Sequence, residues 1–204
     1  MTSRRGGRAS AAPEIVNVGY RSTNYWVVSA GRNRILIDLG WPGTIGTLTA
    51  TLQRMGVPLG ELRYGVATHY HIDHAGAAED LKRLGVALLV LEAQVDAIPL
   101  MKQHTKPQDR YTDITSAGNV VIAFDESRAR LAALGIDGQI VPTPGHSGDS
   151  VSVVLDSGAA FTGDLTPMSM AEPANADALS ASWQRLRDAG ATIVYPGHGA
   201  PRPL

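Results

Sequence analysis

The region from residue 15 to residue 39 alternates between short apolar segments and turn-forming residues. Segments 15–20, 24–29 and 34–39 are rich in Val, Ile, Leu, Tyr and Trp, residues that are common in strands. Ser, Thr, Gly and Asn occur in the two stretches between them, as is typical of tight turns. We therefore expect three consecutive strands that form an antiparallel meander.

A helix is expected directly after this meander. Apolar residues recur at intervals of three and four positions within residues 44–55, which predicts a helix with one apolar face, and Gly56 supplies a stop. A strand over residues 64–67 and a second helix over residues 75–84 are expected next. The run 86–91 is apolar throughout and predicts a strand that is buried on both faces.

The remainder of the chain continues this mixture of strands and helices. A helix over residues 176–189 would bury Leu179, Trp183 and Leu186 on one face. The other elements expected here are a helix over residues 126–134 and strands over residues 120–124, 139–142, 151–155, 159–162 and 192–195.

Residues 92–118 interrupt the pattern. A helix-like start over residues 93–98 meets Pro99, and the part from residue 104 to residue 116 has no clear period. Long irregular stretches inside compact domains are frequently lids or binding loops. We therefore expect a lid-like insertion at residues 92–118.

The order of the elements predicts the fold class α+β. A meander with helices, followed by a second meander with a helix, indicates two sheets packed face to face with helices outside, a four-layer αβ/βα sandwich. A chain of 204 residues suits one such domain, over residues 13–204. Residues 1–12 contain Arg4, Arg5 and Arg8 and predict a disordered basic tail.

Composition narrows the possible partners. A formal net charge of -1 provides no global field that would attract nucleic acid or acidic lipid, and the longest apolar run is too short to span a bilayer. No apolar stretch follows the first basic residues, so we expect no secretory signal and a cytoplasmic location. The chain has no Cys, which excludes disulfides and thiolate ligands. The expected partner is a small-molecule substrate, and the oligomeric state stays open.

Possible metal ligands are concentrated in Thr-His-Tyr-His-Ile-Asp-His, residues 68–74, which holds three of the six His in the chain. Alternate side chains of a strand share a face, so His69 and His71 could point at one ion. Asp73 and His74 would follow in the first turn of a helix, where a carboxylate suits the positive helix end. The alternative is a loop with surface histidines, but this density of imidazoles favours a metal site.

Three further residues share one setting, a predicted strand that ends at a glycine-flanked corner. They are His146 in Pro-Gly-His-Ser-Gly, Asp164 in Thr-Gly-Asp and His198 in Pro-Gly-His-Gly. Each corner alone could be an ordinary turn. Strand ends of a sandwich lie along one edge, however, so the corners can converge, and Gly beside a ligand lets the backbone approach closely.

This set of residues resembles the signature of the metallo-β-lactamase superfamily, a His-x-His-x-Asp-His segment followed by His, Asp and His at strand ends. The resemblance runs from Asp38 to His198 and is to glyoxalase II-like and lactonase-like hydrolases, without the C-terminal helical domain of glyoxalase II. It implies an αβ/βα sandwich with the site in a cleft along its edge, and a supporting role for Asp38 beside the metals. The implied ligands are His69, His71 and His146 for one metal, Asp73, His74 and His198 for a second, and Asp164 bridging both.

The ligand types agree with this resemblance. Imidazole and carboxylate ligands suit Zn²⁺, here two ions per chain, and tolerate Fe or Mn. Two metals that share a carboxylate can hold a hydroxide nucleophile at neutral pH, which Asp73 would orient as a catalytic residue. We therefore expect a metallo-hydrolase of a small ester, thioester or lactone. The alternatives are a mononuclear non-haem iron oxidoreductase of the persulfide dioxygenase kind, a β-lactamase, and a non-enzymatic zinc-stabilised module.

Candidate substrate contacts lie outside the signature. Polar side chains of the lid-like stretch can hydrogen-bond a carbonyl or carboxylate, and Met side chains can line an adaptable apolar pocket. Solvated loop positions or ordinary packing are the alternatives for each. Tyr70, inside the signature, is expected to pack in the core. The candidates are Tyr111, Lys106, Arg110 and His104 in the lid-like stretch, and Met168 and Met170 after Asp164.

Overall fold

The segments expected to form a meander pair with one another in the first sheet. In the computed structural model, which describes residues 13–204, each of these three strands lies antiparallel to the next. Three more strands extend the sheet in parallel, because each returns through a crossover rather than a hairpin. The predicted basic tail, residues 1–12, lies outside the described residues. In sheet order the strands are β1 (Glu14–Asn17), β2 (Trp26–Ala30), β3 (Asn33–Ile37), β4 (Leu62–Val66), β5 (Ala87–Leu91) and β6 (Asn119–Ile122).

The second half of the chain forms a second sheet, in the order β11-β10-β9-β8-β7. Its neighbouring strands are antiparallel except β9 and β10, which run parallel because helix α5 (Ala176–Asp188) connects them. The strands are β7 (Gly138–Pro142), β8 (Val151–Leu155), β9 (Ala159–Gly163), β10 (Ile193–Pro196) and β11 (Arg202–Pro203).

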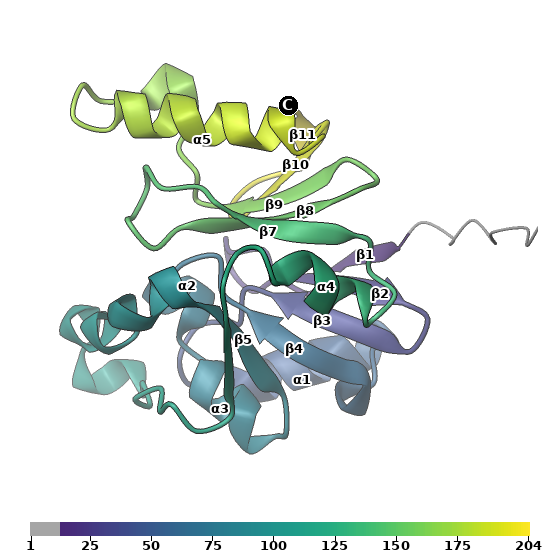
Figure 1. The fold of residues 1–204 in the computed structure, drawn as a ribbon. Helices are drawn as coiled ribbons and strands as arrows, with labels where there is room; N and C mark the ends of the chain where they lie inside the picture. The colour runs from purple at the N-terminus through teal and green to yellow at the C-terminus, as the bar shows by residue number, and fades with distance from the viewer. Residues whose placement is uncertain (1–12) are drawn as a thin grey trace, which may run out of the picture.

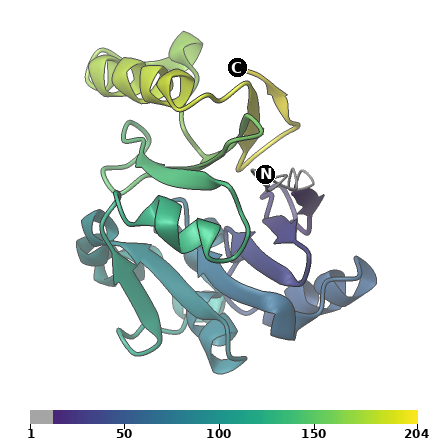
Figure 2. The same cartoon turned by 45° about the vertical axis from the view of Figure 1, so that its right-hand side comes forward.

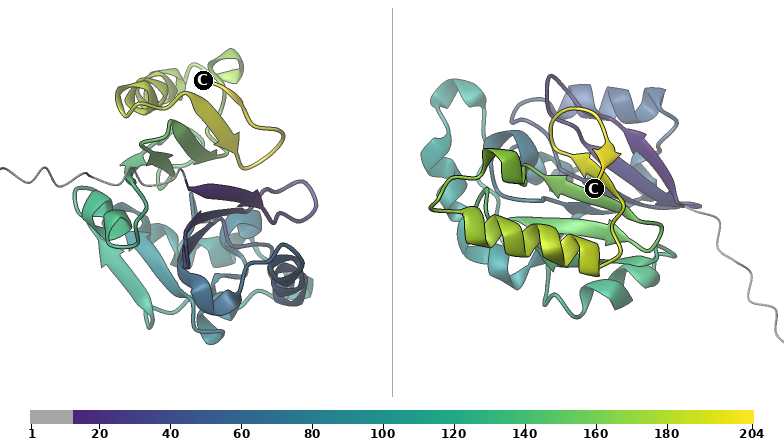
Figure 3. Two further views of the ribbon diagram at one scale, coloured as in Figure 1. Left: turned by 90° about the vertical axis from the view of Figure 1, so that its right-hand side faces the viewer. Right: turned by 90° about the horizontal axis from the view of Figure 1, so that it is seen from above.

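Helices cover the outer faces of both sheets (Figure 1). Helices α1 (Ile45–Arg54) and α3 (Ala78–Arg83) bury leucines against the first sheet. Leu179, Trp183 and Leu186 of α5 are buried against the second, as predicted, and Figure 3 shows α5 crossing the outside of that sheet. The predicted α+β four-layer sandwich is therefore confirmed. Within residues 13–204, no helix has the length and apolar character needed to cross a membrane.

Both faces of the first sheet are apolar. Successive side chains of a strand point to opposite faces, and in this sheet successive residues are apolar. Val27 and Leu36 pack toward the helices, whereas their neighbours Val28 and Ile35 pack toward the second sheet. Phe161 of β9 meets them from that second sheet and is fully buried. Burial of each side chain of this size stabilises the folded state by about 1.5–3 kcal/mol relative to exposure. The shared core therefore holds the two sheets together.

Helix α4 (Ser127–Ala132) closes one edge between the two sheets, as Figures 1 and 2 show. Its Leu131 is fully buried in the core that both sheets share. Gly135 follows the helix with a φ of 82°, a left-handed conformation that favours glycine and is common after the end of a helix.

One predicted helix is divided in the structure. Residues 75–84 contribute to two helices, α2 (Ile72–Ala75) and α3, with the break at Gly76. A Cβ atom on Gly76 would lie 2.3 Å from Pro42 Cδ, so the backbone presses directly against the turn after β3. Ala77 N donates to Gly40 O (3.0 Å) across this contact instead of continuing a helix. The prediction of one continuous helix is therefore wrong, because contacts with the turn after β3 bend the backbone at Gly76.

The stretch predicted to be lid-like consists of short 3₁₀ helices joined by loops. They are η2 (Glu92–Ala97), η3 (Pro99–His104) and η4 (Pro107–Asp109). Pro99 begins η3, because proline is accepted in the first turn of a helix. Met101 is buried and Tyr111 is partly buried against the core under the first sheet. Apolar anchors thus attach the segment to the domain, and its role as a lid stays a prediction.

Candidate metal centre

The His-rich segment leaves the first sheet at the end of β4. Val66 is the last residue paired there, and Val151 N of the second sheet donates to Thr68 O (2.8 Å), which draws the chain between the sheets as a loop. The prediction that strand alternation aligns His69 with His71 is therefore wrong. The loop brings their rings together instead, with centroids 4.5 Å apart.

The remaining ligand candidates also lie at the carboxyl ends of strands. Asp73 and His74 occupy the first turn of α2, as predicted. His146 follows β7, Asp164 follows β9 and His198 follows β10. These strands end at the same edge of the sandwich, so residues far apart in the sequence meet there.

The seven predicted ligands form two groups of donor atoms, and a third group shares residues with both. Asp164 lies between the groups, because its Oδ1 is 3.3 Å from His74 Nε2 and its Oδ2 is 3.4 Å from His198 Nε2. The same Oδ2 is 3.8 Å from His146 Nε2 in the other group. The groups are His69, His71 and His146; Asp73, His74 and His198; and a third, His69, His74 and Asp164, that joins them.

Two glycines allow the ligand loops to approach this closely. A Cβ atom on Gly197 would lie 2.6 Å from both Asp164 Oδ1 and His74 Cε1. One on Gly163 would lie 2.3 Å from Thr68 Oγ1, and Gly163 also has a φ of 52°. The predicted reason for Gly beside the ligands, close backbone approach, is therefore confirmed at these two positions.

Comparison with protein families explains why this constellation occurs on this fold. A sequence model of the metallo-beta-lactamase superfamily matches residues 18–198, from just after β1 to His198, the last predicted ligand. The chain belongs to the metallo-β-lactamase superfamily. The superfamily includes proteins named as hydrolases, and the predicted metallo-hydrolase class agrees with this family.

Individual relatives are distant. The beta-lactamase-like protein 2 homolog of Caenorhabditis elegans is 26% identical over 181 residues, which are 88% of this chain and 56% of that protein. Atrochrysone carboxyl ACP thioesterase of Aspergillus fumigatus is 27% identical over 187 residues, 88% of this chain and 38% of that protein. This chain spans about half the length of the curated relatives it matches. The crystal structure of metallo-beta-lactamase SMB-1 has a TM-score of 0.68 and 21% identity, covers 94% of this chain and 82% of that chain, and shows the shared fold.

The donor spacing fits the metal sites of such a superfamily. Two ligands of one tetrahedral Zn²⁺, each about 2.0–2.2 Å from the ion, lie roughly 3.3 Å apart. His71 Nδ1 is 3.1 Å from His146 Nε2, and His198 Nε2 is 3.3 Å from Asp73 Oδ2. The donor set is nitrogen and oxygen only, which suits Zn²⁺ and also Fe or Mn.

Hydrogen bonds behind the site orient two of the imidazoles. Thr68 Oγ1 donates to Asp38 Oδ1 (2.8 Å) and so accepts from His69 Nδ1 (3.2 Å), while His74 Nδ1 donates to Asp38 Oδ2 (2.8 Å). When these imidazoles are neutral, both Nε2 atoms therefore carry free lone pairs aimed at the centre. They are buried together with Asp164 Oδ1, and none of the three has a hydrogen-bond partner in the described chain. Burying polar atoms without a partner costs free energy, and a cation bound among these three atoms would remove that cost.

The backbone at Asp38 is adapted to this role. Asp38 has a φ of 64°, in the left-handed region that few residues other than Gly, Asn and Asp adopt. The conformation turns the chain at the end of β3 and directs a fully buried carboxylate toward the histidines. The structure thus places Asp38 where the family resemblance implies, directly behind the ligands.

Negative charge surrounds a buried imidazole at the centre. Burial alone would lower the pKa of His74, but the negative charges of the neighbouring carboxylates, Asp38 first and then Asp164 and Asp73, raise that pKa to about 12. Burial would raise the pKa of Asp73, but His74 holds it down at about 2. Burial and the neighbouring imidazoles lower the pKa of His69 well below its usual range. The carboxylates around His74 therefore stabilise a positive charge at the centre, either a proton on His74 or a metal cation.

Sequence reasoning missed the contribution of the β1–β2 loop. His198 Nδ1 donates to Ser22 O (2.7 Å), and Thr23 Oγ1 donates to Asp73 Oδ2 (3.1 Å). Asn24 Nδ2 donates to the carbonyl oxygens before and after this histidine, on Pro196 (2.9 Å) and Gly199 (2.8 Å). Turn-forming composition was the only sign of this loop in the sequence, and it carries no information about a partner more than 170 residues away.

Gln94 and Asp149 were also missed, although they connect the loops of the three-histidine group. Gln94 is fully buried, and its Nε2 donates to Ala67 O (3.1 Å) and to Asp149 O (3.2 Å). Asp149 Oδ2 in turn accepts from Tyr70 N (2.8 Å). The loop that carries His69 is thereby tied to the loop before β8. No motif marks Gln94, because it lies in the stretch where the sequence pattern is weakest.

The centre is closed on its inner side and open on its outer side. His69 and His74 are buried, whereas the side chains of Asp164 and His198 are 18% and 40% exposed. Two cavities flank it. One of about 320 Å³ touches His146, Asp164 and His198, and one of about 380 Å³ is lined by Tyr70, His71, Ile72, Asp73 and His104. A substrate could therefore reach the donor groups from either side.

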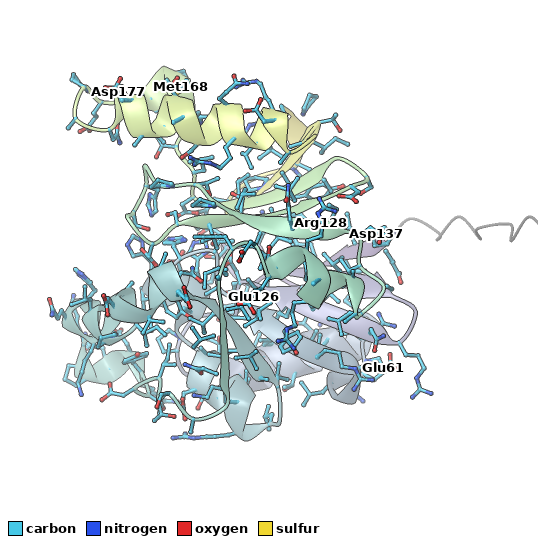
Figure 4. The ribbon with its side chains drawn as sticks, viewed as in Figure 1. Glu61, Glu126, Arg128, Asp137, Met168 and Asp177 are labelled. Atoms are coloured by element: carbon cyan, nitrogen blue, oxygen red, sulfur yellow. The ribbon has the colours of Figure 1, made fainter. Side chains whose placement is uncertain are left out.

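The structure separates the candidate substrate contacts. Tyr111, Lys106 and Arg110 line a different and larger cavity of about 680 Å³, between α3 and residues 102–115, which none of the seven ligands lines. Met168 is 46% exposed and lies beside the start of α5, near Asp177 (Figure 4).

Three other singled-out residues lie nearer the centre. Met170, not Met168, lines the cavity beside Asp164. His104 lines the cavity on the other side but belongs to none of the donor groups. Tyr70 is 4% exposed and packs in the core, as predicted.

Proposed function

We propose that this chain is a metal-dependent hydrolase that holds two zinc ions and cleaves a small ester, thioester or lactone. One observation carries the proposal, namely two groups of three donors that converge on either side of a single carboxylate, Asp164. A structural zinc site is closed by four ligands, whereas this centre has seven donors and an open outer face.

Each donor group would hold one ion. His69, His71 and His146 supply three nitrogen donors for the first. The second group combines Asp73 with the imidazoles of His74 and His198. Asp164 lies close to both donor groups. When bound, such ions lower the pKa of water to about 7 and polarise a carbonyl oxygen.

The chain's own residues would position the reactants. Asp73 stays ionised at neutral pH because its pKa is held at about 2. Its carboxylate faces the centre, with Thr23 Oγ1 donating to Oδ2 (3.1 Å), which restricts its rotation. Asp73 would accept a hydrogen bond from the attacking water and orient it toward the carbonyl carbon, and the proton that this water loses would pass to the leaving group.

The choice of ester-like substrates is supported by a relative's name and by the chemistry of the donors. One relative, at 27% identity, is named a thioesterase. A nucleophile that derives from water needs no Ser or Cys, and this chain has no Cys at all. The walls of the cavity beside Asp164 include Leu165, Pro167 and Met170, which suit a small aliphatic group.

The test combines metal analysis with a substrate panel. Purified protein is expected to contain about two Zn per chain and to hydrolyse at least one member of a panel of short thioesters, aryl esters and lactones. The His146→Ala and His198→Ala variants, one in each group, should each lose about one metal and most of the activity. A single iron with oxygen consumption would instead indicate an oxidoreductase, and turnover of β-lactams alone would indicate a lactamase.

A further inference from the structure

The cavity beside Asp164 and His198 contains one cationic side chain, Arg202. Arg202 lies on β11, the edge strand, and pairs with Val194 of β10. Paired residues of neighbouring strands point to the same side of the sheet, and Val194 faces the core under α5. Arg202 therefore projects from the α5 side of the second sheet and lines the cavity together with ligand candidates His146, Asp164 and His198.

Arg202 has no partner among the described residues, unlike two other half-buried arginines, Arg34 and Arg185. Arg34 donates to Glu61 Oε2 (3.1 Å), and Arg185 donates to Pro142 O (2.7 Å). No hydrogen bond or ion pair joins the Arg202 guanidinium to any residue between 13 and 204, although the residue is only partly exposed. A partly desolvated guanidinium without a counterion is costly unless a ligand supplies one.

The surroundings of Arg202 indicate which ligand group fits. The guanidinium presents parallel N–H donors in a planar fork that matches a carboxylate. The remaining walls between Arg202 and the ligands are largely apolar and include Leu165, Pro167 and Pro196. Within residues 13–204, Arg202 is the one guanidinium at this cavity and offers one unit of positive charge, so a singly charged carboxylate fits it better than a doubly charged phosphate.

We propose that Arg202 recognises a carboxylate on the substrate, so that the favoured substrates are esters, thioesters or lactones carrying a second, free carboxylate. This inference rests on the proposed hydrolase function. The carboxylate would dock at Arg202 while the scissile carbonyl lies at the donor groups a short aliphatic distance away. The cavity lined by Ile72 and His104 on the other side would take the rest of the molecule.

The test uses matched substrates that differ only in that carboxylate. Aryl thioesters of straight-chain dicarboxylic acids of four to six carbons are compared with those of monocarboxylic acids of equal length. A charge-assisted hydrogen-bonded pair is worth roughly 10- to 100-fold in affinity. The zinc-loaded protein should therefore favour the dicarboxylic series by about 10-fold or more in kcat/KM, mainly through KM.

Two variants and a control assign the effect to Arg202. Arg202→Met keeps an unbranched stem without the guanidinium and should remove the preference, leaving the monocarboxylic series within about 2-fold of the unmodified protein. Arg202→Lys keeps the charge without the fork and should be intermediate. Arg128→Met removes an exposed arginine that pairs with Asp156 and should change neither series. Metal content and Tm, measured for every variant, show that each is folded and loaded.

Calorimetry measures the binding of the free dicarboxylic acids to the zinc-loaded protein. This measurement separates failure of this inference from failure of the proposed function. Turnover without preference, or a preference that survives in Arg202→Met, overturns the role of Arg202 and leaves the hydrolase intact. Arg202-dependent binding without turnover of any ester or thioester overturns the hydrolase and retains the carboxylate site. Neither binding nor turnover overturns both.

Discussion

Asp38 shows how one buried residue organises the chemistry of its neighbours. It accepts hydrogen bonds from Thr68 and His74, and through Thr68 it also sets the orientation of His69. A carboxylate can only accept hydrogen bonds, so both imidazoles are forced to keep a proton on Nδ1 and to present Nε2 to the centre. The tautomers of two predicted ligands therefore depend on a residue that would not itself touch a metal.

Replacement of Asp38 by Asn tests this dependence. The amide keeps the shape but has one acceptor oxygen, so His74 Nδ1 or Thr68 loses its partner. Zinc affinity is expected to fall about 10- to 100-fold, the usual effect of losing such a partner. Competition with a chromophoric chelator measures the change. Asp156→Asn, at an exposed ion pair with Arg128, is the control and should bind zinc normally, and equal affinities in the two variants would contradict the proposed role.

Gly197 tests how tightly the backbone must approach the ligands. An alanine Cβ would lie 2.6 Å from Asp164 Oδ1 and from the His74 ring, so one of the loops must move. Gly197→Ala is expected to lose most of the bound metal in the group of Asp73, His74 and His198, as measured by elemental analysis. Gly148→Ala, where no atom lies within 4 Å of the new Cβ, is the matched control. Retention of full metal content by Gly197→Ala would show that the loop adjusts freely.

At the scale of elements, the site depends on contacts between loops of different sheets. Gln94 of η2 donates to Ala67 O after β4 and to Asp149 O before β8, and Leu91 N donates to its Oε1 (3.3 Å). One buried amide thus links β5 and both sheets at the edge where the ligands lie. The sequence predicted a helix-like segment here but could not assign this connection.

Gln94→Leu should therefore affect one donor group more than the other. The substitution leaves two buried carbonyl oxygens without a donor, which costs about 1–3 kcal/mol, and it loosens the loop that carries His69 and His71. We expect a lower Tm and a changed visible spectrum for Co²⁺ in the three-histidine group. Gln184→Leu, on the exposed face of α5, should leave both unchanged. A loss of stability with an unaltered Co²⁺ spectrum would limit Gln94 to a purely structural role.

At the scale of the whole molecule, the candidate metal centre joins parts of the chain that are distant in sequence. The β1–β2 loop contacts the loop after β10 through an isolated bridge between Thr23 and His198 and through Asn24 N, which donates to Gly197 O (2.7 Å). Figure 3 shows β10 and β11 beside the β1–β2 hairpin. Metal binding should therefore stabilise the fold as a whole.

Metal removal tests this coupling. At about 100 times its Kd, a ligand adds about 2.7 kcal/mol of stability, and each kcal/mol raises Tm by about 2–4 °C in a chain of this size. Zinc added to chelator-treated protein should therefore raise Tm by about 5–10 °C in calorimetry. Mg²⁺, which prefers oxygen ligands, should have little effect at the same concentration. Equal shifts with both ions would contradict a centre built from these imidazoles.

The sequence by itself determined the elements and the chemistry of the site. Apolar periodicity is local, so it predicted the meander, the buried run of β5 and the apolar face of α5. Ligand types and their glycine-flanked corners are also local, and they indicated nitrogen and oxygen ligands at strand ends. Four layers followed because apolar faces on both sides of two sheets must be covered.

Tertiary structure alone decided which residues support the site. Ser22, Asn24 and Gln94 belong to no motif, and each contacts residues that are brought near only by folding. The break at Gly76 likewise depends on its contact with Pro42, a residue from another part of the chain. The physical reason is the short range of hydrogen bonds and van der Waals contacts. Such contacts act over about 3–4 Å, and only the packed sandwich sets distances on that scale.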